Sequence, residues 1–292
     1  MSTERKIIAC MNVGWNVDWI LPRNLAVLAN IVDEIVVVGG NLSKNAVNLI
    51  NGNEKVTFFL DRKNEKWRSE VKDFNIMTRE AGRRGADWVI FVDFDEVFSA
   101  QAAEKIRKLA EADGVGVYRF PRVWLWRGEE YYRVDRPEKY VRHNQISVMV
   151  RYSSELQWPG LSGPFWKRVL KHLLGREKLY PQHGRGEIQG YKGRVVDTDV
   201  VLLHYAAVNW EHFVRKSMRY VGWERIRLPK KPLDDIVGWA YETMDEKGLA
   251  LKEAHPDWFN YPFKVPDVEG IVNQYNVLPP LKPKAEINIH LS

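Results

Sequence analysis

The chain has 292 residues and a single cysteine, Cys10. It can form no internal disulfide, and a zinc site built from several cysteines is excluded. No stretch approaches the about 18 uninterrupted apolar residues of a membrane-spanning helix. The opening residues, MSTERK, lack the pattern of a secretory signal peptide. We therefore expect a cytoplasmic protein without a membrane-spanning helix, and we leave open a peripheral contact with the membrane face.

Positive charge exceeds negative charge, and the net charge is +6. This balance suits nucleic acid, an anionic membrane surface or a phosphorylated small molecule. Because the cations are not gathered into one long run, nucleic acid is the least favoured of the three partners. The 12 Trp, 12 Tyr and 11 Phe residues are an unusual excess. Aromatic rings beside polar groups form platforms for sugar rings, so the excess also suits a carbohydrate site.

Apolar runs and helical periodicity alternate regularly up to residue 120. We expect strands over about 6–13, 35–38, 56–60, 88–92 and 115–120, with helices over about 18–32, 43–49, 69–84 and 100–112. In the first helix Asp18 is the expected N-cap. This order predicts an α/β fold with a mixed, mainly parallel sheet flanked by helices. Ligands of such sheets bind at the carboxyl ends of the strands.

The stretch at 86–98 carries the strongest chemical signal. The apolar run Trp88–Val92 stops on three carboxylates, Asp93, Asp95 and Glu96. Like charges this close destabilise one another unless a cation or a polar ligand is near. We interpret the strand end as a site for a divalent metal and a phosphorylated ligand. The alternative is a solvated acidic turn.

Four segments of the chain, in this order, resemble a known family. They are Val32–Val38, Asn75 with Gly85–Trp88, Val92–Phe98, and Leu202–Tyr205 followed by Phe213, Lys216 and Tyr220. With these segments the chain resembles the family 2-like nucleotide-sugar glycosyltransferases of the GT-A fold, over about residues 6–228. The resemblance implies a GT-A domain over 1–228, with a Rossmann-like nucleotide-sugar half over 1–120 and an acceptor half over 121–228. A C-terminal helix and an aromatic, proline-rich extension occupy 229–292.

The resemblance also implies an activity. The chain is expected to be a metal-dependent, inverting, hexosyltransferase-like glycosyltransferase. It would move a sugar from a nucleoside-diphosphate donor to a hydroxyl of a glycan, a lipid-linked or a protein acceptor. The sequence leaves the sugar, the nucleotide, the acceptor and the oligomeric state open.

The expected site residues follow from chemistry and from the resemblance together. Mn²⁺ or Mg²⁺ prefers carboxylate oxygens, and Asp95 is the first expected ligand. The resemblance adds Asp93, near the ribose or the metal, and His204 as a further metal ligand. Lys216 is expected to neutralise the diphosphate. Glu96 is expected either to order the loop or to hold a cation.

Two more groups of residues are candidates for binding and catalysis. Asp61 and Arg62 follow the third strand and could contact the nucleoside of the donor. An inverting transfer needs a base for the acceptor hydroxyl. Glu187, in a glycine-rich loop with Arg185, is the expected catalytic base; the rivals that stay open are Asp135, Asp197 and Asp199. Tryptophans that could line an acceptor cleft are Trp124, Trp126, Trp158 and Trp166.

The second strand departs from the family pattern. The family commonly has a pair of aspartates there, whereas this chain reads Gly39-Gly40-Asn41-Leu42-Ser43. Asn41 or Ser43 could replace the missing nucleotide contact. Two alternative functions stay open: a nucleotidyltransferase of similar fold, and a non-catalytic carbohydrate- or nucleic-acid-binding protein. A nucleotidyltransferase would normally carry a cation in the loop after the first strand, and residues 12–17 contain none.

Overall fold

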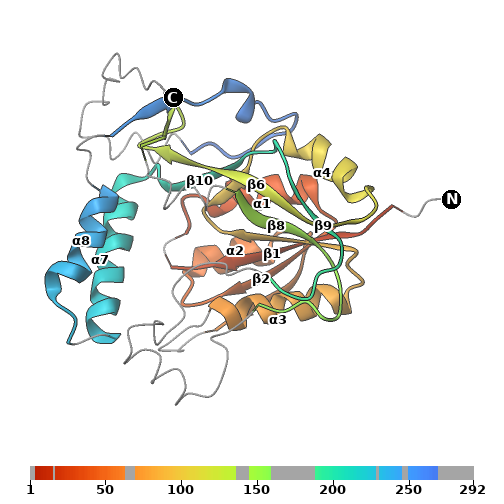
Figure 1. Ribbon diagram of the computed structural model, residues 1–292, viewed down its shortest axis with the longest axis horizontal. Helices are drawn as coiled ribbons and strands as arrows, with labels where there is room; N and C mark the ends of the chain where they lie inside the picture. The colour runs from red at the N-terminus through yellow and green to blue at the C-terminus, as the bar shows by residue number, and fades with distance from the viewer. Residues whose placement is uncertain are drawn as a thin grey trace.

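Four parallel strands form one half of the sheet (Figure 1). They are β1 (Ile7–Val13), β2 (Glu34–Gly39), β3 (Val56–Asp61) and β4 (Trp88–Asp93), and they lie in the order β3-β2-β1-β4. The helices that connect them are α1 (Leu21–Ile31), α2 (Lys44–Asn51) and α3 (Glu70–Arg83). The computed structural model describes residues 4–15, 17–62, 70–135, 145–158, 188–227, 230–244 and 249–268.

The other half of the sheet is mixed. β8 (Gln145–Arg151) is antiparallel to β4 and to β6 (Val115–Trp126), while β9 (Arg194–Asp197) and β10 (Leu202–Ala207) are parallel to β6. The short strands are β5 (Glu96–Phe98), which pairs with β10, and β7 (Tyr131–Arg133), which pairs with β6 and with β11 (Leu251–Glu253). The predicted α/β fold with a mixed sheet and flanking helices is confirmed.

Alternation along the strands builds two hydrophobic clusters, one on each face of the sheet. Ile7, Ala9 and Met11 of β1 belong to the cluster that includes buried residues of α1, α2 and α4 (Ala102–Ala110). Ile8 and Cys10 point the other way, into the cluster formed with α3. Successive side chains of a strand point to opposite faces, and both faces of β1 are apolar. A strand of this kind must be covered on both sides, which is why the helices flank the sheet.

Two more helices, α7 (Trp210–Arg227) and α8 (Leu233–Met244), form a pair beside the sheet (Figure 1). In that view the N-terminus lies on the opposite side of the molecule. The pair therefore stands at the side toward which the parallel strands run. None of the helices in the described parts of the chain is long and apolar enough to span a bilayer.

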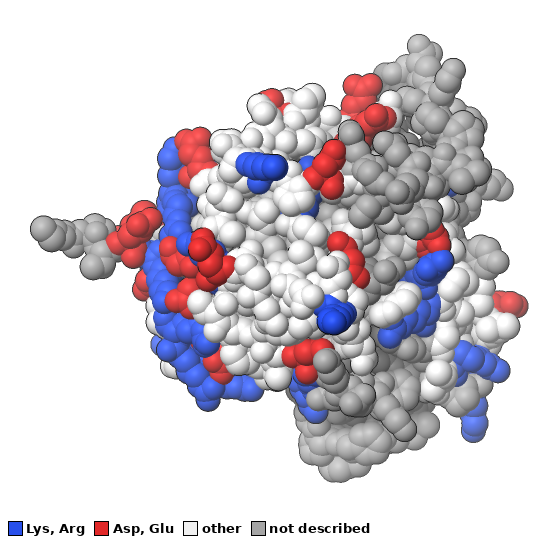
Figure 2. Space-filling model, turned by 180° about the vertical axis from the view of Figure 1, so that it is seen from behind, with Lys and Arg blue, Asp and Glu red and all other residues white. Residues whose placement is uncertain are grey.

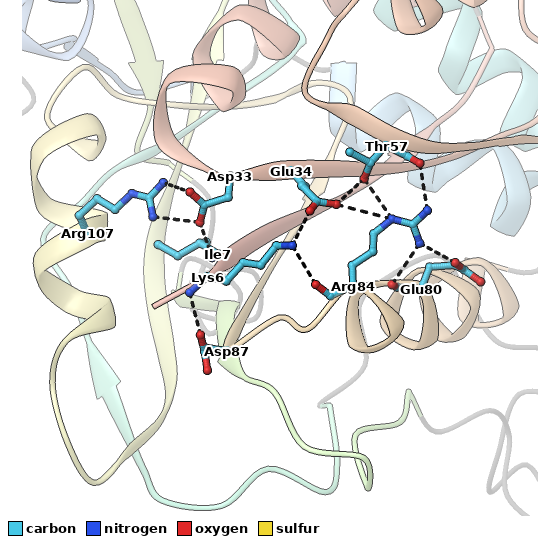
Figure 3. A network of polar contacts seen from close by, with 9 residues as sticks. All are labelled: Lys6, Ile7, Asp33, Glu34, Thr57, Glu80, Arg84, Asp87 and Arg107. Carbon is cyan, nitrogen blue, oxygen red and sulfur yellow. Dashed lines mark hydrogen bonds and ion pairs between the residues drawn. The ribbon is translucent and has the colours of Figure 1, made fainter. Parts of the chain in front are cut away.

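Polar contacts hold the amino ends of the parallel strands (Figure 3). The Asp33 carboxylate accepts hydrogen bonds from Ile7 N–H at 2.7 Å and from both Nη atoms of Arg107 at 3.0 and 2.7 Å. Burial alone would raise the pKa of Asp33, but these hydrogen bonds hold it below its ordinary value. Lys6 bonds to Glu34 and to the carbonyl of Arg84. Cations and acids are paired at this edge of the sheet.

The aromatic residues of the tail pack on the sheet rather than away from it. Trp258, Phe259, Tyr261 and Phe263 lie against the larger hydrophobic cluster. Tyr261 Oη also donates to the carbonyl oxygen of Phe98 at 2.6 Å. Residues 256–268, which follow β11, thus lie across the end of β5; we call this segment the tail strap.

Asp18 is not the N-cap of α1, so that prediction is wrong. Ile20 holds the cap position and makes no side-chain capping bond. The Asp18 carboxylate instead accepts from Ser43 Oγ at 2.7 Å and from Asn45 Nδ2 at 3.2 Å. Ser43 in turn caps α2 by accepting from Ala46 N–H at 2.9 Å. Ser43, 25 residues away, bonds to the Asp18 carboxylate in place of the helix backbone. A partner so far along the chain cannot be recognised from the residues around Asp18.

Candidate functional site

The acidic segment is a tight turn between β4 and β5, and backbone contacts from two other strands shape it. β4 ends at Asp93, and β5 begins at Glu96. Phe94 N–H donates to the carbonyl of Asn12 in β1 at 3.1 Å, and Tyr205 N–H in β10 donates to the carbonyl of Asp95 at 2.8 Å. These bonds to β1 and β10 fix the turn, so its carboxylates have defined positions. Asp95 and Glu96 are only 2% and 1% exposed, so the solvated acidic turn considered above is wrong.

One buried amide completes this turn. Asn24 in α1 is fully buried, and its Nδ2 lies 3.1, 2.9 and 3.0 Å from the carbonyl oxygens of Asp93, Phe94 and Glu96. The two N–H groups of a single side chain thus serve three backbone carbonyls of the turn. Sequence reasoning did not single out Asn24, because it lies among the apolar positions of an ordinary amphipathic helix.

Asp95 is the centre of the site. Its side chain is 3% exposed, and its Oδ2 accepts a hydrogen bond from Lys216 Nζ of α7 at 2.7 Å. His204 Nε2 of β10 lies 3.8 Å from the same oxygen. Three residues expected at the site from the sequence, far apart along the chain, thus meet at the carboxyl end of β4.

The charges of Asp95 and Lys216 stabilise each other. Burial alone would raise the pKa of Asp95, but the nearby positive charge of Lys216 and its hydrogen bond hold it well below its ordinary value. Burial alone would lower the pKa of Lys216, but the Asp95 carboxylate raises it above its ordinary value. Both groups are therefore ionised near neutral pH. The site presents a fixed ammonium group at the strand end.

Glu96 is buried, and its carboxylate orders the turn. Its Oε2 accepts from Asp93 N–H at 3.0 Å, and its Oε1 accepts from Arg122 Nη1 of β6 at 3.2 Å. Burial lowers the pKa of Arg122, while the charges of Asp93 and Asp95 oppose that effect. Arg122 adds a second cation to the site, and nothing in the sequence pattern of β6 pointed to it.

His212 is another residue that sequence reasoning missed. It lies one turn before Lys216 on α7, is 3% exposed, and packs against Trp19 with ring centroids 5.5 Å apart. Burial and the neighbouring Lys216 charge lower its pKa to about 4. His212 is therefore a neutral imidazole at physiological pH. Its i, i+4 spacing to Lys216 was the available signal.

Two of the expected metal ligands have a spacing that fits one metal ion. Two ligands of one ion, each about 2.1 Å from it, lie at most about 4.2 Å apart. The separation of 3.8 Å between Asp95 Oδ2 and His204 Nε2 falls within that limit. Among the described residues no three His, Cys, Asp or Glu side chains are grouped to hold an ion. Ions such as Mg²⁺ commonly take one or two protein carboxylates and complete their shell with substrate phosphates and water.

Asp61 and Arg62 lie at the carboxyl end of β3, three strands from β4. At about 4.8 Å between neighbouring strands, three strand positions separate them from β4 by about 14 Å. Arg62 forms an ion pair with the buried Asp73 of α3, and its N–H donates to the carbonyl of Gly39 at 2.9 Å. They share the sheet edge with Asp95 but not its immediate contacts.

The candidate bases fall into two groups. Glu187 and its neighbour Arg185 lie outside the described residues, so Glu187 stays a prediction. Asp135 is held by Arg133 through hydrogen bonds of 3.0 and 2.6 Å. Asp197 pairs with Arg119 at 2.6 Å, and Asp199 pairs with Lys105 at 2.5 Å. Each of these rivals to Glu187 is thus engaged by a cation of its own.

Of the described tryptophans expected around an acceptor cleft, Trp124 lies beside the candidate site and the others lie in the core. Trp124 packs edge-on against His204 with ring centroids 4.7 Å apart, which places it next to Asp95. Trp126 and Trp158 are buried core residues, and Trp166 lies outside the described residues. Trp15, after β1, was not anticipated: it is 42% exposed, and the Arg219 guanidinium lies over its ring at 4.8 Å.

No protein-family model matches the chain, and no curated protein matches its sequence. Among solved structures, residues 1–349 of S. aureus TarS match with a TM-score of 0.42 and 12% identity, over 82% of this chain and 73% of that chain. The same fragment in complex with UDP matches with a TM-score of 0.42 and 11% identity, over 82% of each chain. Against the longer TarS structure the TM-score is 0.41 at 12% identity, over 75% of this chain, which spans 39% of that protein. These similarities are too distant to assign an activity, so the function must be argued from the site.

Proposed function

We propose that the chain is a glycosyltransferase that takes its sugar from a nucleoside-diphosphate donor. One observation carries the proposal: Asp95, Lys216 and His204 converge at the carboxyl end of a parallel strand. Ligands of open α/β sheets bind at this edge. The order of the four sequence segments that resemble such enzymes supports the same reading.

The site has the charges that departure of a diphosphate needs. As the bond from the sugar to the donor breaks, negative charge gathers on the leaving oxygen. Lys216 and Arg122 are the cations beside Asp95, and both come from elements that the fold fixes in place. We propose that Lys216 moves from Asp95 to the diphosphate when the donor binds.

We propose Asp95 and His204 as the protein ligands of a divalent metal, with Asp93 adjacent to them. When bound, such an ion supplies positive charge to the leaving diphosphate. Lys216 now bonds to the Asp95 oxygen that lies closest to His204. Asp95 would therefore exchange its ammonium partner for the ion, and the released ammonium would be available to the phosphates.

On the acceptor side, we propose that Trp124 packs against the acceptor and that Glu187 removes the proton of its hydroxyl. Trp124 supports the first part because it contacts His204 at the site. A base on the face opposite the leaving group would give inversion at the sugar carbon. Asp61 and Arg62 remain the proposed contacts to the nucleoside, further along the sheet edge.

A thermal-shift screen of nucleoside diphosphates, with and without Mn²⁺, tests the proposal. We expect one nucleotide to raise the melting temperature, because a ligand that binds only the folded state stabilises it. Asp95→Asn should abolish that shift and lower sugar transfer from the matching donor at least about 100-fold. Asp113→Asn, which alters the ion pair of an exposed carboxylate with Arg5, is the matched control and should change transfer less than about twofold.

Failure of every nucleoside diphosphate and nucleotide sugar to bind would refute the proposal. Binding of a nucleotide sugar without any turnover would instead favour a non-catalytic binding protein. The glycine pair at the end of β2 is the feature that favours this second function, because no carboxylate follows Gly39 and Gly40 there.

A further inference from the structure

Helix α7 has two faces of different character. His212, Phe213 and Lys216 point toward the site and are buried or half-buried. On the outer side the exposed positions are Arg215, Met218, Gly222, Arg225 and Ile226. At 3.6 residues per turn these five positions fall within an arc of about 100°. One helix thus contributes to the candidate site and presents a continuous outer face.

Large apolar side chains are exposed on this helix pair. Ile226 is 65% exposed and Met218 is 41% exposed on α7, and Leu233 at the start of α8 is 55% exposed. Elsewhere in the described parts of the chain only Trp15 and Val195 are large apolar residues of comparable exposure. Single exposed apolar residues are ordinary, but a group of them marks a contact surface.

Positive charge surrounds these apolar residues. Apart from Lys216, which bonds to Asp95, the sequence between Trp210 and Asp235 has six Lys or Arg and four Asp or Glu, a difference of +2. Two of the four acids, Asp234 and Asp235, lie in the first turn of α8. In Figure 2 blue side chains outnumber red ones on the right-hand edge, where α7 and α8 lie. At the opposite edge red and blue alternate, as the paired network of Figure 3 requires.

We propose that the outer face of α7, together with Leu233, binds the surface of an anionic membrane. Ile226, Met218 and Leu233 would enter the head-group region, and the arginines beside them would pair with lipid phosphates. A second copy of the chain fits this face poorly, because a two-fold contact would bring two surfaces of net positive charge together. The proposal does not depend on the glycosyltransferase activity.

The geometry keeps the site accessible in the bound state. Lys216 and Ile226 are ten residues apart on one helix, which corresponds to about 15 Å along its axis. Lys216 points away from the outer face, since it bonds to Asp95. Membrane binding through this face would therefore hold the site near the lipid head groups without covering it.

Co-sedimentation of the full chain with vesicles tests the proposal. The vesicles are phosphatidylcholine alone, or phosphatidylcholine with 30% phosphatidylglycerol, each at low and high salt. We expect binding to the anionic vesicles at low salt, with a loss of at least about tenfold at high salt. Ile226→Glu should weaken binding at least about tenfold, because it removes an inserting side chain and adds a negative charge.

Val195→Glu is the matched control: Val195 is 42% exposed on β9, and the variant has the same change of charge. It should bind within about twofold of the natural chain. An unchanged melting temperature would show that both variants fold. The proposal is overturned if the natural chain does not bind anionic vesicles, or if both variants bind them equally. It is also overturned if sedimentation equilibrium shows a dimer that Ile226→Glu dissociates.

Discussion

The buried side-chain amide of Asn24 in α1 holds the acidic turn at residues 93–96 in place. Replacing it by leucine keeps the volume but removes the two N–H groups that three backbone carbonyls of the turn share. Each unsatisfied buried acceptor costs about 1–3 kcal/mol, and partial rearrangement lowers the sum. We expect Asn24→Leu to lower the free energy of unfolding by about 2–4 kcal/mol in urea denaturation.

Asn30 on the same helix supplies the control for this prediction. It is exposed, and its Nδ2 bonds only to the carbonyl of Ala26 at 2.8 Å. Asn30→Leu should change the free energy of unfolding by less than about 0.5 kcal/mol. Equal effects of the two variants would contradict the role of Asn24 in holding the turn.

Lys216 and a metal ion would use the same oxygen of Asp95. Lys216→Met leaves the Asp95 carboxylate buried without its ammonium partner, which should cost about 3 kcal/mol of stability. Asp95 in this variant is then free to bind Mn²⁺ without displacing a cation. We expect Mn²⁺ to raise the melting temperature of Lys216→Met by several degrees more than that of the natural chain.

A charge change far from the site is the comparison for Lys216. Lys105 forms an exposed ion pair with Asp199. Lys105→Met should respond to Mn²⁺ as the natural chain does. If Mn²⁺ shifts the melting temperatures of Lys216→Met and Lys105→Met equally, Lys216 does not compete for the metal position.

At the scale of elements, the start of β1 depends on a carboxylate in the loop before β2. Asp33 accepts from Ile7 N–H and from Arg107, and its pKa in the folded chain lies below its ordinary value. A lowered folded pKa adds stability above the unfolded pKa of about 3.9, and this contribution is lost as pH falls through the folded value. Asp33→Asn should therefore cost about 1 kcal/mol at pH 7, because the pair is partly exposed.

The pH dependence separates this effect from a general loss of packing. Urea titrations at a series of pH values should show the natural chain and Asp33→Asn converging below about pH 4. A constant difference from pH 7 down to pH 2 would mean that the charge of Asp33 contributes nothing. Asp197→Asn, in an exposed pair with Arg119, should show a smaller difference at pH 7.

The elements with strong periodicity could be predicted from the sequence. The helix expected over 69–84 is α3 with one residue less at each end, and the buried strand expected over 88–92 is β4 with one more residue. The three-residue strand β5 was not predicted, because Glu96–Phe98 is too short for a pattern. Its pairing with β10 joins residues more than 100 positions apart, such as Val97 and Leu203. Contacts of that range carry no local signal.

The site shows the same division. Asp95, His204 and Lys216 were found in the sequence because a strand end and a family-like segment marked them. Asn24 and Arg122 were missed because each acts through a partner on another element, and their own neighbours in the sequence are unremarkable. A residue that is functional only through a distant contact becomes visible once the fold brings the contact together.

At the scale of the whole molecule, the tail strap and the acidic turn share one buried polar cluster. Arg23 of α1 is 7% exposed and pairs with Glu129 at 2.8 Å. Its guanidinium lies 5.5 Å from the ring centre of Tyr205 and 5.9 Å from that of Tyr261. Tyr261 thus covers the buried guanidinium of Arg23, in addition to its hydrogen bond to Phe98. The strap should therefore belong to the same cooperative unit as the sheet.

Tyr261 tests this cooperativity. Tyr261→Ala removes a ring from the cover of Arg23 and should lower the free energy of unfolding by about 3–5 kcal/mol, whereas Tyr261→Phe loses only the hydrogen bond, at about 1 kcal/mol. In both variants circular dichroism and protease cleavage within residues 249–268 should follow a single urea transition, because a strap that covers a buried charge cannot detach without exposing it. Cleavage of the strap at urea concentrations where the circular dichroism is still native would show instead that the strap unfolds independently. In that case Arg23 and Glu129 would be stable without it.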